Sequence, residues 1–310
     1  MKEFTSDQIR NVALIGHGSS GKTILADAML LTSGATTRIG RIEDGSTTSD
    51  YHSDEIERQI SINSTLLSTE YRGHKLNIID TPGYSDFQGD VISSLRVVDT
   101  SLLVLKSVEG VEVGSELVWN FAMQANLPVV IAVNKMDNEH ADFDRVYEEA
   151  RQRFGPDVAV AQFPVNKGPN FNATIDVIRM KMMTFSTDGS GKYTESEVPE
   201  EFKERIEAEH QALMEKVAES SEDLLNAFFE NGMLSESELA EGLKAAIRNR
   251  KVFPMFCMAA AQNIGVGRMM EFLINYCPDP VTGKTVTLLK AGSDEEVTVK
   301  IGRASGRERV

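Results

Sequence analysis

Eight consecutive residues of this 310-residue chain fit the pattern G-x-x-x-x-G-K-[ST]. They are Gly16, His17, Gly18, Ser19, Ser20, Gly21, Lys22 and Thr23. Glycines let backbone amides curl around phosphate oxygens, and the N-terminus of a following helix favours negative charge. The segment therefore predicts a nucleoside triphosphate site, with Lys22 at the β- and γ-phosphates and the Thr23 hydroxyl on Mg²⁺. His17 fits a turn residue better than an acid or a base.

A second polar segment, Asp80-Thr81-Pro82-Gly83, follows an apolar run at 76–79. Ligands of open α/β sheets bind at the carboxyl ends of strands, so Asp80 is placed to hold a water on Mg²⁺. Gly83 leaves its amide free to approach a γ-phosphate closely, which would let the loop sense that phosphate. Alone the tetrapeptide fits an ordinary turn; together with the first motif it indicates a phosphate-sensing loop.

A third motif, Asn134-Lys135-Met136-Asp137, comes directly after the apolar run at 129–133. The carboxylate of Asp137 can accept the N1 hydrogen and the 2-amino hydrogens of guanine, which adenine cannot offer, while the Lys135 stem covers the base. After the run at 252–257, Ala259 and Ala260 are placed to present a backbone N–H to the guanine carbonyl oxygen. These segments predict guanine as the base.

The elements that must position these motifs alternate along the chain. Helical patterns at 24–31 and 115–124, the second with Ser115 as a candidate N-cap, lie between short apolar runs of strand length. This alternation predicts an α/β fold with a mostly parallel sheet and helices on both faces. A strand at 60–71 and another at 76–80 are joined by a tight turn at 72–75, so one antiparallel edge strand is expected.

Two long segments interrupt the alternation. Residues 33–57 are polar and unusually long for a connection, which is typical of a functional or mobile loop. Residues 157–250 contain a Met-rich strand pattern near 178–185 and several acidic helices. Between Glu195 and Glu241 the chain has 15 acidic and 3 basic side chains, so most of the net charge of −15 lies there. This acidity fits either a solvated helix face or a docking surface for a basic partner.

These patterns predict a domain organisation. Because 121 residues separate Asp137 from Ala259, the acidic segment is expected to be an α+β insertion within the nucleotide domain. We expect the nucleotide domain at 1–156 and 251–280, the insertion at 157–250, and a linker or non-native tail at 281–310. We also expect the chain to be the N-terminal fragment of a longer protein.

The composition excludes several classes of protein. An excess of 47 acidic over 32 basic residues argues against broad binding to nucleic acid phosphates. The two cysteines, Cys257 and Cys277, support neither a disulfide framework nor a zinc site. We find no signal peptide and no apolar stretch long enough to span a membrane. The interpretation is a cytoplasmic monomer without sequence-specific nucleic acid binding.

The order of the motifs resembles the translational GTPases, specifically the elongation factor G family, and within it the elongation factor G-like second paralogue. The likeness covers about 10–280 and includes Leu95-Arg96-Val97-Val98-Asp99 and Val108-Glu109-Gly110-Val111. It implies a P-loop GTPase fold, GTP and GDP as ligands, Mg²⁺ as cofactor and the ribosome as partner. The later domains of the family are absent from this chain, so we do not expect it to move tRNA alone.

The sequence departs from the main family pattern at several positions. Glu57-Arg58 is followed by Gln59-Ile60-Ser61-Ile62 where the family has Gly-Ile-Thr-Ile, so Ser61 would supply the hydroxyl for Mg²⁺. Tyr84 stands where the family carries the histidine that orients the attacking water, which predicts slow hydrolysis. Ser19 and Ala259 replace an aspartate and a serine; the first alters the surroundings of the phosphates, and the second keeps its backbone donor.

Three hypotheses follow. The first is a Mg²⁺-dependent GTPase in which Lys22 and loop amides, with that of Gly83, stabilise charge on the transferring phosphate and Tyr84 occupies the water-facing position. The second is a GTP-dependent switch with negligible hydrolysis because of Tyr84. The third is an unrelated P-loop ATPase, in which ATP would displace GTP readily.

Overall fold

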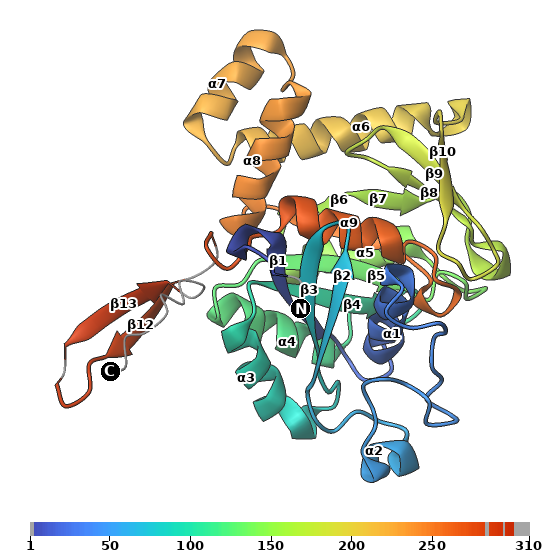
Figure 1. Ribbon diagram of the computed structural model, residues 1–310. Helices are drawn as coiled ribbons and strands as arrows, with labels where there is room; N and C mark the ends of the chain where they lie inside the picture. Colours follow the sequence, from blue (N-terminus) through green and yellow to red (C-terminus); the bar gives the residue numbers. More distant parts are fainter. Residues whose placement is uncertain (1–2, 283–284, 294, 301–310) are drawn as a thin grey trace.

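The computed structural model describes residues 3–282, 285–293 and 295–300. Its largest sheet has seven strands in the order β2-β3-β1-β4-β5-β11-β6, all parallel to their neighbours except β2, which is antiparallel to β3 (Figure 1). The strands are β1 (Ile9–Ile15), β2 (Thr65–Tyr71), β3 (His74–Asp80), β4 (Thr100–Lys106), β5 (Val129–Asn134), β6 (Val158–Val160) and β11 (Phe253–Cys257).

Helices cover both faces of this sheet, as the alternation predicted. One face is covered by α1 (Lys22–Ser33) and α9 (Val266–Tyr276), and the other by α3 (Gln88–Val97), α4 (Val113–Gln124) and α5 (Phe143–Phe154). Every residue of β4 and β5 is therefore buried, which explains their continuous apolar sequences. The short elements of this part are η1 (Ser6–Gln8), α2 (Ser53–Arg58), η2 (Ser85–Phe87) and η4 (Ala260–Gln262); a further short helix, η3 (Gly168–Asn170), lies between β7 and β8.

The edge strand β2 differs from the central strands. Its side chains alternate between buried and exposed positions, because only one of its faces is covered. The turn into β3 consists of Arg72 and Gly73, whose φ angles of 46° and 80° match a hairpin turn that needs positive φ at both positions. The antiparallel edge is thus confirmed, but the strand begins at Thr65, and 60–64 lie outside it.

A second, four-stranded antiparallel sheet has the order β10-β9-β8-β7 and contacts the first of three helices, which packs against the other two. The strands are β7 (Gln162–Pro164), β8 (Ala173–Asp176), β9 (Lys181–Phe185) and β10 (Tyr193–Ser196); the helices are α6 (Glu200–Ala218), α7 (Glu222–Asn231) and α8 (Glu236–Arg248). We call this unit, from β7 to α8, the insert. The strand β6 lies inside the predicted insertion but pairs with β11 in the main sheet.

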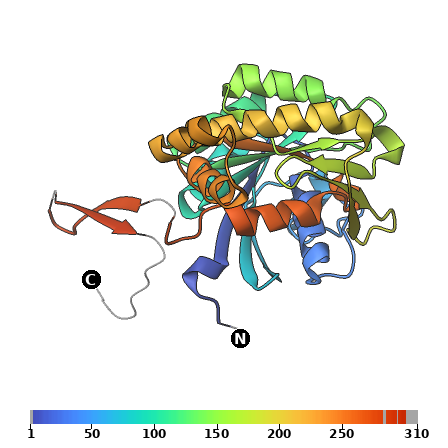
Figure 2. The same cartoon turned by 90° about the horizontal axis from the view of Figure 1, so that it is seen from above.

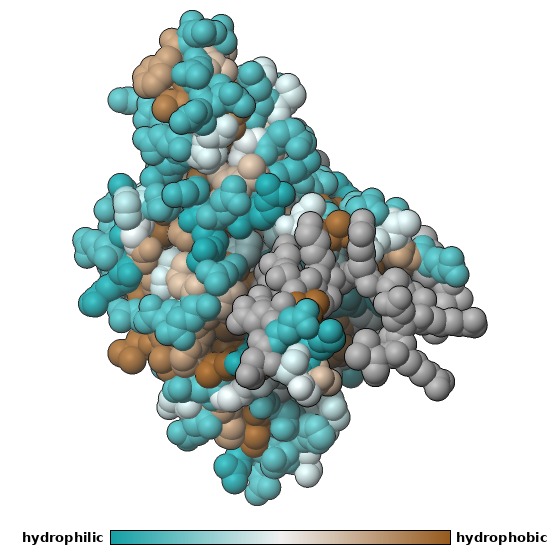
Figure 3. Space-filling view, turned by 90° about the vertical axis from the view of Figure 1, so that its left-hand side faces the viewer, coloured by the Kyte–Doolittle hydropathy of each residue, from teal (hydrophilic) through white to brown (hydrophobic). Residues whose placement is uncertain are grey.

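The two units share one continuous apolar core, and Figure 2 shows α6 running alongside the main sheet. The surface of the insert is mainly hydrophilic, with an apolar patch at its α7 end (Figure 3), where Phe229 and Met233 are exposed. Among the described residues, no helix combines the length and hydropathy needed to cross a bilayer.

Two local predictions were wrong. Ser115 is not the N-cap of α4: that residue is Glu112, and Ser115 lies buried within the first turn. The segment 281–310 is not simply a linker or tail, because β12 (Thr285–Leu289) and β13 (Glu296–Lys300) form an antiparallel hairpin that lies apart from the rest (Figures 1 and 2). Residues 301–310 lie outside the described part of the chain.

Candidate functional site

The carboxyl edge of the main sheet brings the predicted loops together. The side chain of Asn134, at the end of β5, donates to the carbonyl oxygen of Ser20 at 3.0 Å. The same side chain accepts from the backbone N–H of Ala260 at 3.0 Å. One amide therefore joins the glycine-rich loop after β1 to the loops after β5 and β11, as a single site for phosphates and base requires.

The glycine-rich loop is shaped by close backbone approaches. Gly21 has a φ of 95° and caps α1, and a β-carbon there would lie 2.4 Å from Nδ2 of Asn134. Glycine is therefore needed both for the left-handed conformation and for the contact. Ser19 also has a positive φ and lines a cavity that these loops surround. Ser20 and Thr23 are buried.

Lys22 is buried at the start of α1. Its Nζ atom donates to the carbonyl oxygens of Gly16 and His17 at 3.0 and 3.1 Å. Burial lowers the pKa of Lys22 to about 8, although the charges of Asp80 and Asp50 oppose this shift. A buried ammonium that shares its protons with main-chain carbonyls is available to an anion that enters the cavity.

Asp80 is the second buried charge of the site. Both of its carboxylate oxygens are buried, and neither has a hydrogen-bond partner within the described part of the chain. Burial raises the pKa of Asp80 to about 6, against the opposing charge of Lys22. Burial likewise raises the pKa of Asp50, which lines the same cavity.

The residues predicted to hold Mg²⁺ lie close to one another. The hydroxyl oxygens of Thr23 and Ser61 are 3.1 Å apart, although 37 residues separate them in the sequence. Hard oxygen ligands of this kind, beside the unpartnered carboxylate of Asp80, suit Mg²⁺. The donor set therefore fits the cation that the sequence predicted.

The loop after β3 lies against the glycine-rich loop. A β-carbon at Gly83 would lie 2.5 Å from Nζ of Lys22, so only glycine permits this approach. The ring of Tyr84 lies over Gly18, where a β-carbon would be 3.1 Å from the Cζ atom of the tyrosine. Tyr84 is 44% exposed and lines the mouth of the cavity.

Two buried carboxylates that the sequence analysis missed fix the long loop around the site. Asp27, on α1, accepts from the backbone N–H groups of Gly40 at 2.8 Å and Thr48 at 3.1 Å. Glu55, on α2, accepts from the backbone N–H groups of Ile62 and Asn63, both at 2.9 Å. The segment that carries Ser61 is thereby held next to α1. Glu55 is a buried acid inside a polar loop. The sequence pattern alone could not distinguish it from an acid that is exposed to solvent.

The residues predicted to recognise the base follow β5 and β11. Lys135 has a φ of 63° and lines the cavity. The carboxylate of Asp137 is 3.4 Å from the Nε2 atom of Gln262, which donates to it. Ala259 is buried and pairs with Ile264 through both of their backbone N–H groups at 3.1 Å, which closes the loop that contains Ala260.

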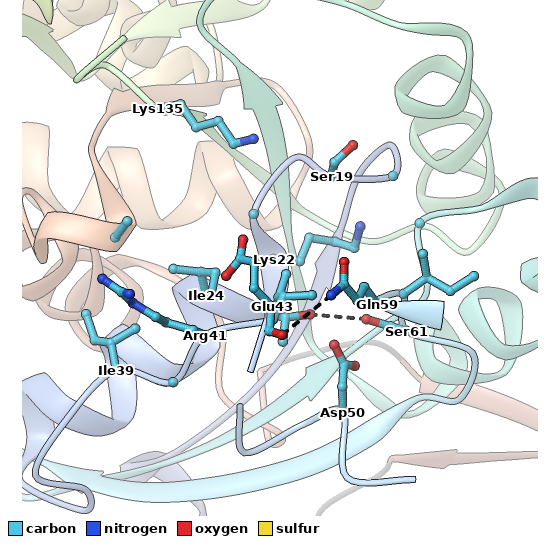
Figure 4. Close-up of a pocket in the computed structure, with 18 of the residues that line it drawn as sticks. Ser19, Lys22, Ile24, Ile39, Arg41, Glu43, Asp50, Gln59, Ser61 and Lys135 are labelled. Atoms are coloured by element: carbon cyan, nitrogen blue, oxygen red, sulfur yellow. Dashed lines mark hydrogen bonds between the residues drawn. The ribbon is translucent and has the colours of Figure 1, made fainter. Parts of the chain in front are cut away.

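These loops surround a cavity of about 880 Å³ that is large enough for a nucleotide. Figure 4 shows Lys22, Ser61 and Asp50 grouped together, with Lys135 farther along the cavity. His17 points elsewhere: its Nε2 atom lies 3.4 Å from a carboxylate oxygen of Glu112, near the start of α4. Its position agrees with a turn residue.

The sheet order, the helices on both faces and the loops at the carboxyl edge define a P-loop GTPase fold with an additional antiparallel sheet. Residues 7–279 match the family described as the elongation factor Tu GTP binding domain. The chain therefore belongs to this family of translational GTPases. The translational GTPase family and the P-loop GTPase fold predicted from the sequence are both confirmed.

A protein of Thermus thermophilus with a known crystal structure is similar to the chain, with a TM-score of 0.83 and 30% sequence identity. The similarity covers 90% of this chain and 42% of that protein. The chain thus spans less than half of the length of the protein that it matches.

Proposed function

We propose that the chain is the GTP-binding and GTP-hydrolysing module of an elongation factor G-like, ribosome-associated translation factor. The observation that carries this proposal is the double hydrogen bond of Asn134, which joins the phosphate loop to the base loops at one cavity. The carboxylate of Asp137 would accept the hydrogens of the guanine edge. The backbone N–H groups of Ala259 and Ala260 donate to Ile264 and Asn134, so these two residues shape the base loop and do not themselves donate to the base. GTP and GDP are the proposed ligands.

Thr23 and Ser61 would hold Mg²⁺, with Asp80 bonded to it through water. The bound cation would neutralise phosphate charge and fix the orientation of the γ-phosphate. Lys22 donates to the phosphate oxygens in place of its bonds to Gly16 and His17. The backbone N–H of Gly83, directly beside Lys22, stabilises charge that develops on the γ-phosphate as water attacks in line.

Tyr84 takes the position next to the attacking water. Its ring packs on Gly18, and its partial exposure leaves one side open to solvent. A neutral phenol is a poor base, so hydrolysis depends on positioning and charge stabilisation alone. This arrangement also supports a second function, a GTP-dependent conformational switch with negligible hydrolysis.

The two functions are separated by single-turnover GTP hydrolysis at increasing ribosome concentration, measured on the complete gene product. The GTPase predicts a rate that rises with ribosome concentration. The Tyr84→His variant is expected to hydrolyse GTP at least about 10-fold faster, because an imidazole can take part in proton transfer. A rate that stays near zero with ribosomes present would overturn the GTPase and support the switch.

The remaining parts of the proposal come from the family. We infer that the ribosome is the partner of the full-length protein, that the protein acts in the cytoplasm as a monomer, and that it reads no nucleic acid sequence. The boundaries proposed for the nucleotide domain and the insertion remain predictions.

A further inference from the structure

Asn263 is a buried polar side chain at the point where the insert meets the nucleotide site. Its Oδ1 atom accepts from the hydroxyl of Thr32, near the end of α1, at 2.8 Å. Its Nδ2 atom donates to the carbonyl oxygen of Gly189, in the turn between β9 and β10, at 3.2 Å. Asn263 itself is fully buried, and both bonds are partly buried. One amide thus joins the base loop, the phosphate-loop helix and the insert.

Asn263 also closes the loop that faces the base. It follows η4, has a φ of 56°, and donates its backbone N–H to Ala260 at 3.0 Å. Ala260 in turn is held by Asn134. The loop is therefore fixed at one end by Asn134 and at the other by Asn263. A displacement of Asn263 would therefore also move Ala260, because the loop between them is closed and only a few residues long.

The insert contacts this asparagine through two glycines: Gly189 accepts its hydrogen bond, and Gly191 lies directly against its side chain. A β-carbon at Gly191 would lie 2.7 Å from the Nδ2 atom of Asn263, whereas a β-carbon at Gly189 would meet nothing within 4 Å. Both glycines have positive φ angles, 69° and 75°. Figure 1 shows the β9–β10 turn on the right, close to the orange segment that leads into α9.

We propose that Asn263 is a positioning residue through which the β9–β10 turn of the insert sets the lifetime of the bound guanine nucleotide. The inference rests on the proposed guanine nucleotide site. The base loop has to open for the nucleotide to leave, and the hydrogen bonds of Asn263 resist this opening. A partner or a motion that shifts the β9–β10 turn would loosen the base loop and accelerate release, without contacting the nucleotide.

Gly191 and Gly232 provide a matched test on the full chain, with the dissociation rate of fluorescent GDP as the measurement. Both lie in the insert at similar positive φ angles, 69° and 72°, but Gly232 is in the turn after α7, where a β-carbon would meet nothing within 4 Å. The thermal midpoints of Gly191→Ala and Gly232→Ala should therefore fall by similar amounts. Only Gly191→Ala displaces Asn263, and we expect it to release GDP about 3- to 10-fold faster, as the loss of one hydrogen bond implies. Gly232→Ala should release GDP at the unaltered rate.

Two variants of the asparagine complete the test, and both should accelerate the release of GDP. Asn263→Ala removes both side-chain hydrogen bonds. Asn263→Asp keeps the acceptor for Thr32 but loses the donor to Gly189. Adding Gly191→Ala to Asn263→Ala should add little, because both changes break one contact. Equal release rates for the two glycine variants would overturn the inference while leaving the nucleotide site intact. Absence of GDP binding by the unaltered chain would overturn the proposed function itself.

Discussion

Two regions of this molecule bury charge, and they stabilise it differently. At the nucleotide-facing edge, the carboxylate of Asp80 has no hydrogen-bond partner in the described residues, and Lys22 donates to main-chain carbonyls. At the junction of α9 with the insert, Arg268 bonds to Asp176 at 2.6 Å, and Arg179 bonds to Glu271 at 2.7 Å. Charged side chains are thus available to a ligand at the nucleotide-facing edge, whereas they form ion pairs with each other where the two units are joined.

The physical reason is the cost of burying a charge. An ion pair offsets much of that cost within the fold, although the Nη1 and Nη2 atoms of Arg268 have no hydrogen-bond partner in the described residues. The unpartnered carboxylate at the loop edge is not compensated in this way, and its raised pKa shows the same cost. A phosphate and a divalent cation would supply the missing partners. The comparison therefore predicts that junction variants lose stability and that loop-edge variants lose ligand binding.

The largest effect on folding is expected at Arg268. Replacing it in the Arg268→Met variant leaves Asp176, which is fully buried, without its partner. We expect a loss of about 3–5 kcal/mol in the free energy of unfolding, measured by urea denaturation. Lys244→Met removes an exposed partner of Glu241 and serves as the control, with an expected loss below about 1 kcal/mol. Similar losses for the two variants would contradict the comparison.

At the loop edge, Lys22→Met should have the opposite effects to Arg268→Met: it should weaken ligand binding and leave the stability of the fold intact. Methionine keeps an apolar stem and removes the ammonium group, whose charge is disfavoured by burial. We expect the dissociation constant for GDP to rise at least about 100-fold, through the loss of charge-assisted hydrogen bonds. The thermal midpoint of the ligand-free variant should stay level or rise. A fall as large as that of Arg268→Met would show that Lys22 has a structural role.

A smaller and pH-dependent effect is expected for Glu271→Gln. Burial would raise the pKa of Glu271, but its bond to Arg179 and the nearby guanidinium groups outweigh burial and hold the pKa below its ordinary value of 4.5. The charged form therefore stabilises the fold above about 4.5, and this contribution is lost as the pH falls through the lowered pKa. Urea midpoints of the variant and the unaltered chain should differ at neutral pH and converge in acid. A difference that is constant with pH would contradict this.

Much of the fold could be predicted from the sequence, because the signals are local. The central strands of the main sheet contain continuous apolar runs, and the turn at Arg72 and Gly73 is marked by its glycine. The capping box of α8, in which Ser235 and Glu238 bond to each other's backbone, is likewise a pattern within four residues. The position of the motif loops at one edge of the sheet follows from the rule that ligands bind at the carboxyl ends of strands.

The features that were missed depend on contacts between distant segments. Asn263 bonds to Thr32, 231 residues away, and Glu55 bonds to the backbone of Ile62, which carries no sequence signal. Ser115 satisfied the propensity for an N-cap, but the helix begins earlier, at Val113, because helix ends are less sharply encoded in the sequence than helix interiors. The pairing of β6 with β11 could not be read from three apolar residues.

The central claim is that one cavity distinguishes guanine through Asp137 while Lys22 binds the phosphates. Calorimetric titration of the unaltered chain and of Asp137→Ala with GDP, and with ADP as competitor, tests it most directly. The account predicts that the unaltered chain binds GDP and that ADP does not compete. It also predicts that Asp137→Ala loses most of the preference for GDP over ADP. Equal binding of GDP and ADP by the unaltered chain, or a preference for GDP that survives in Asp137→Ala, would contradict it.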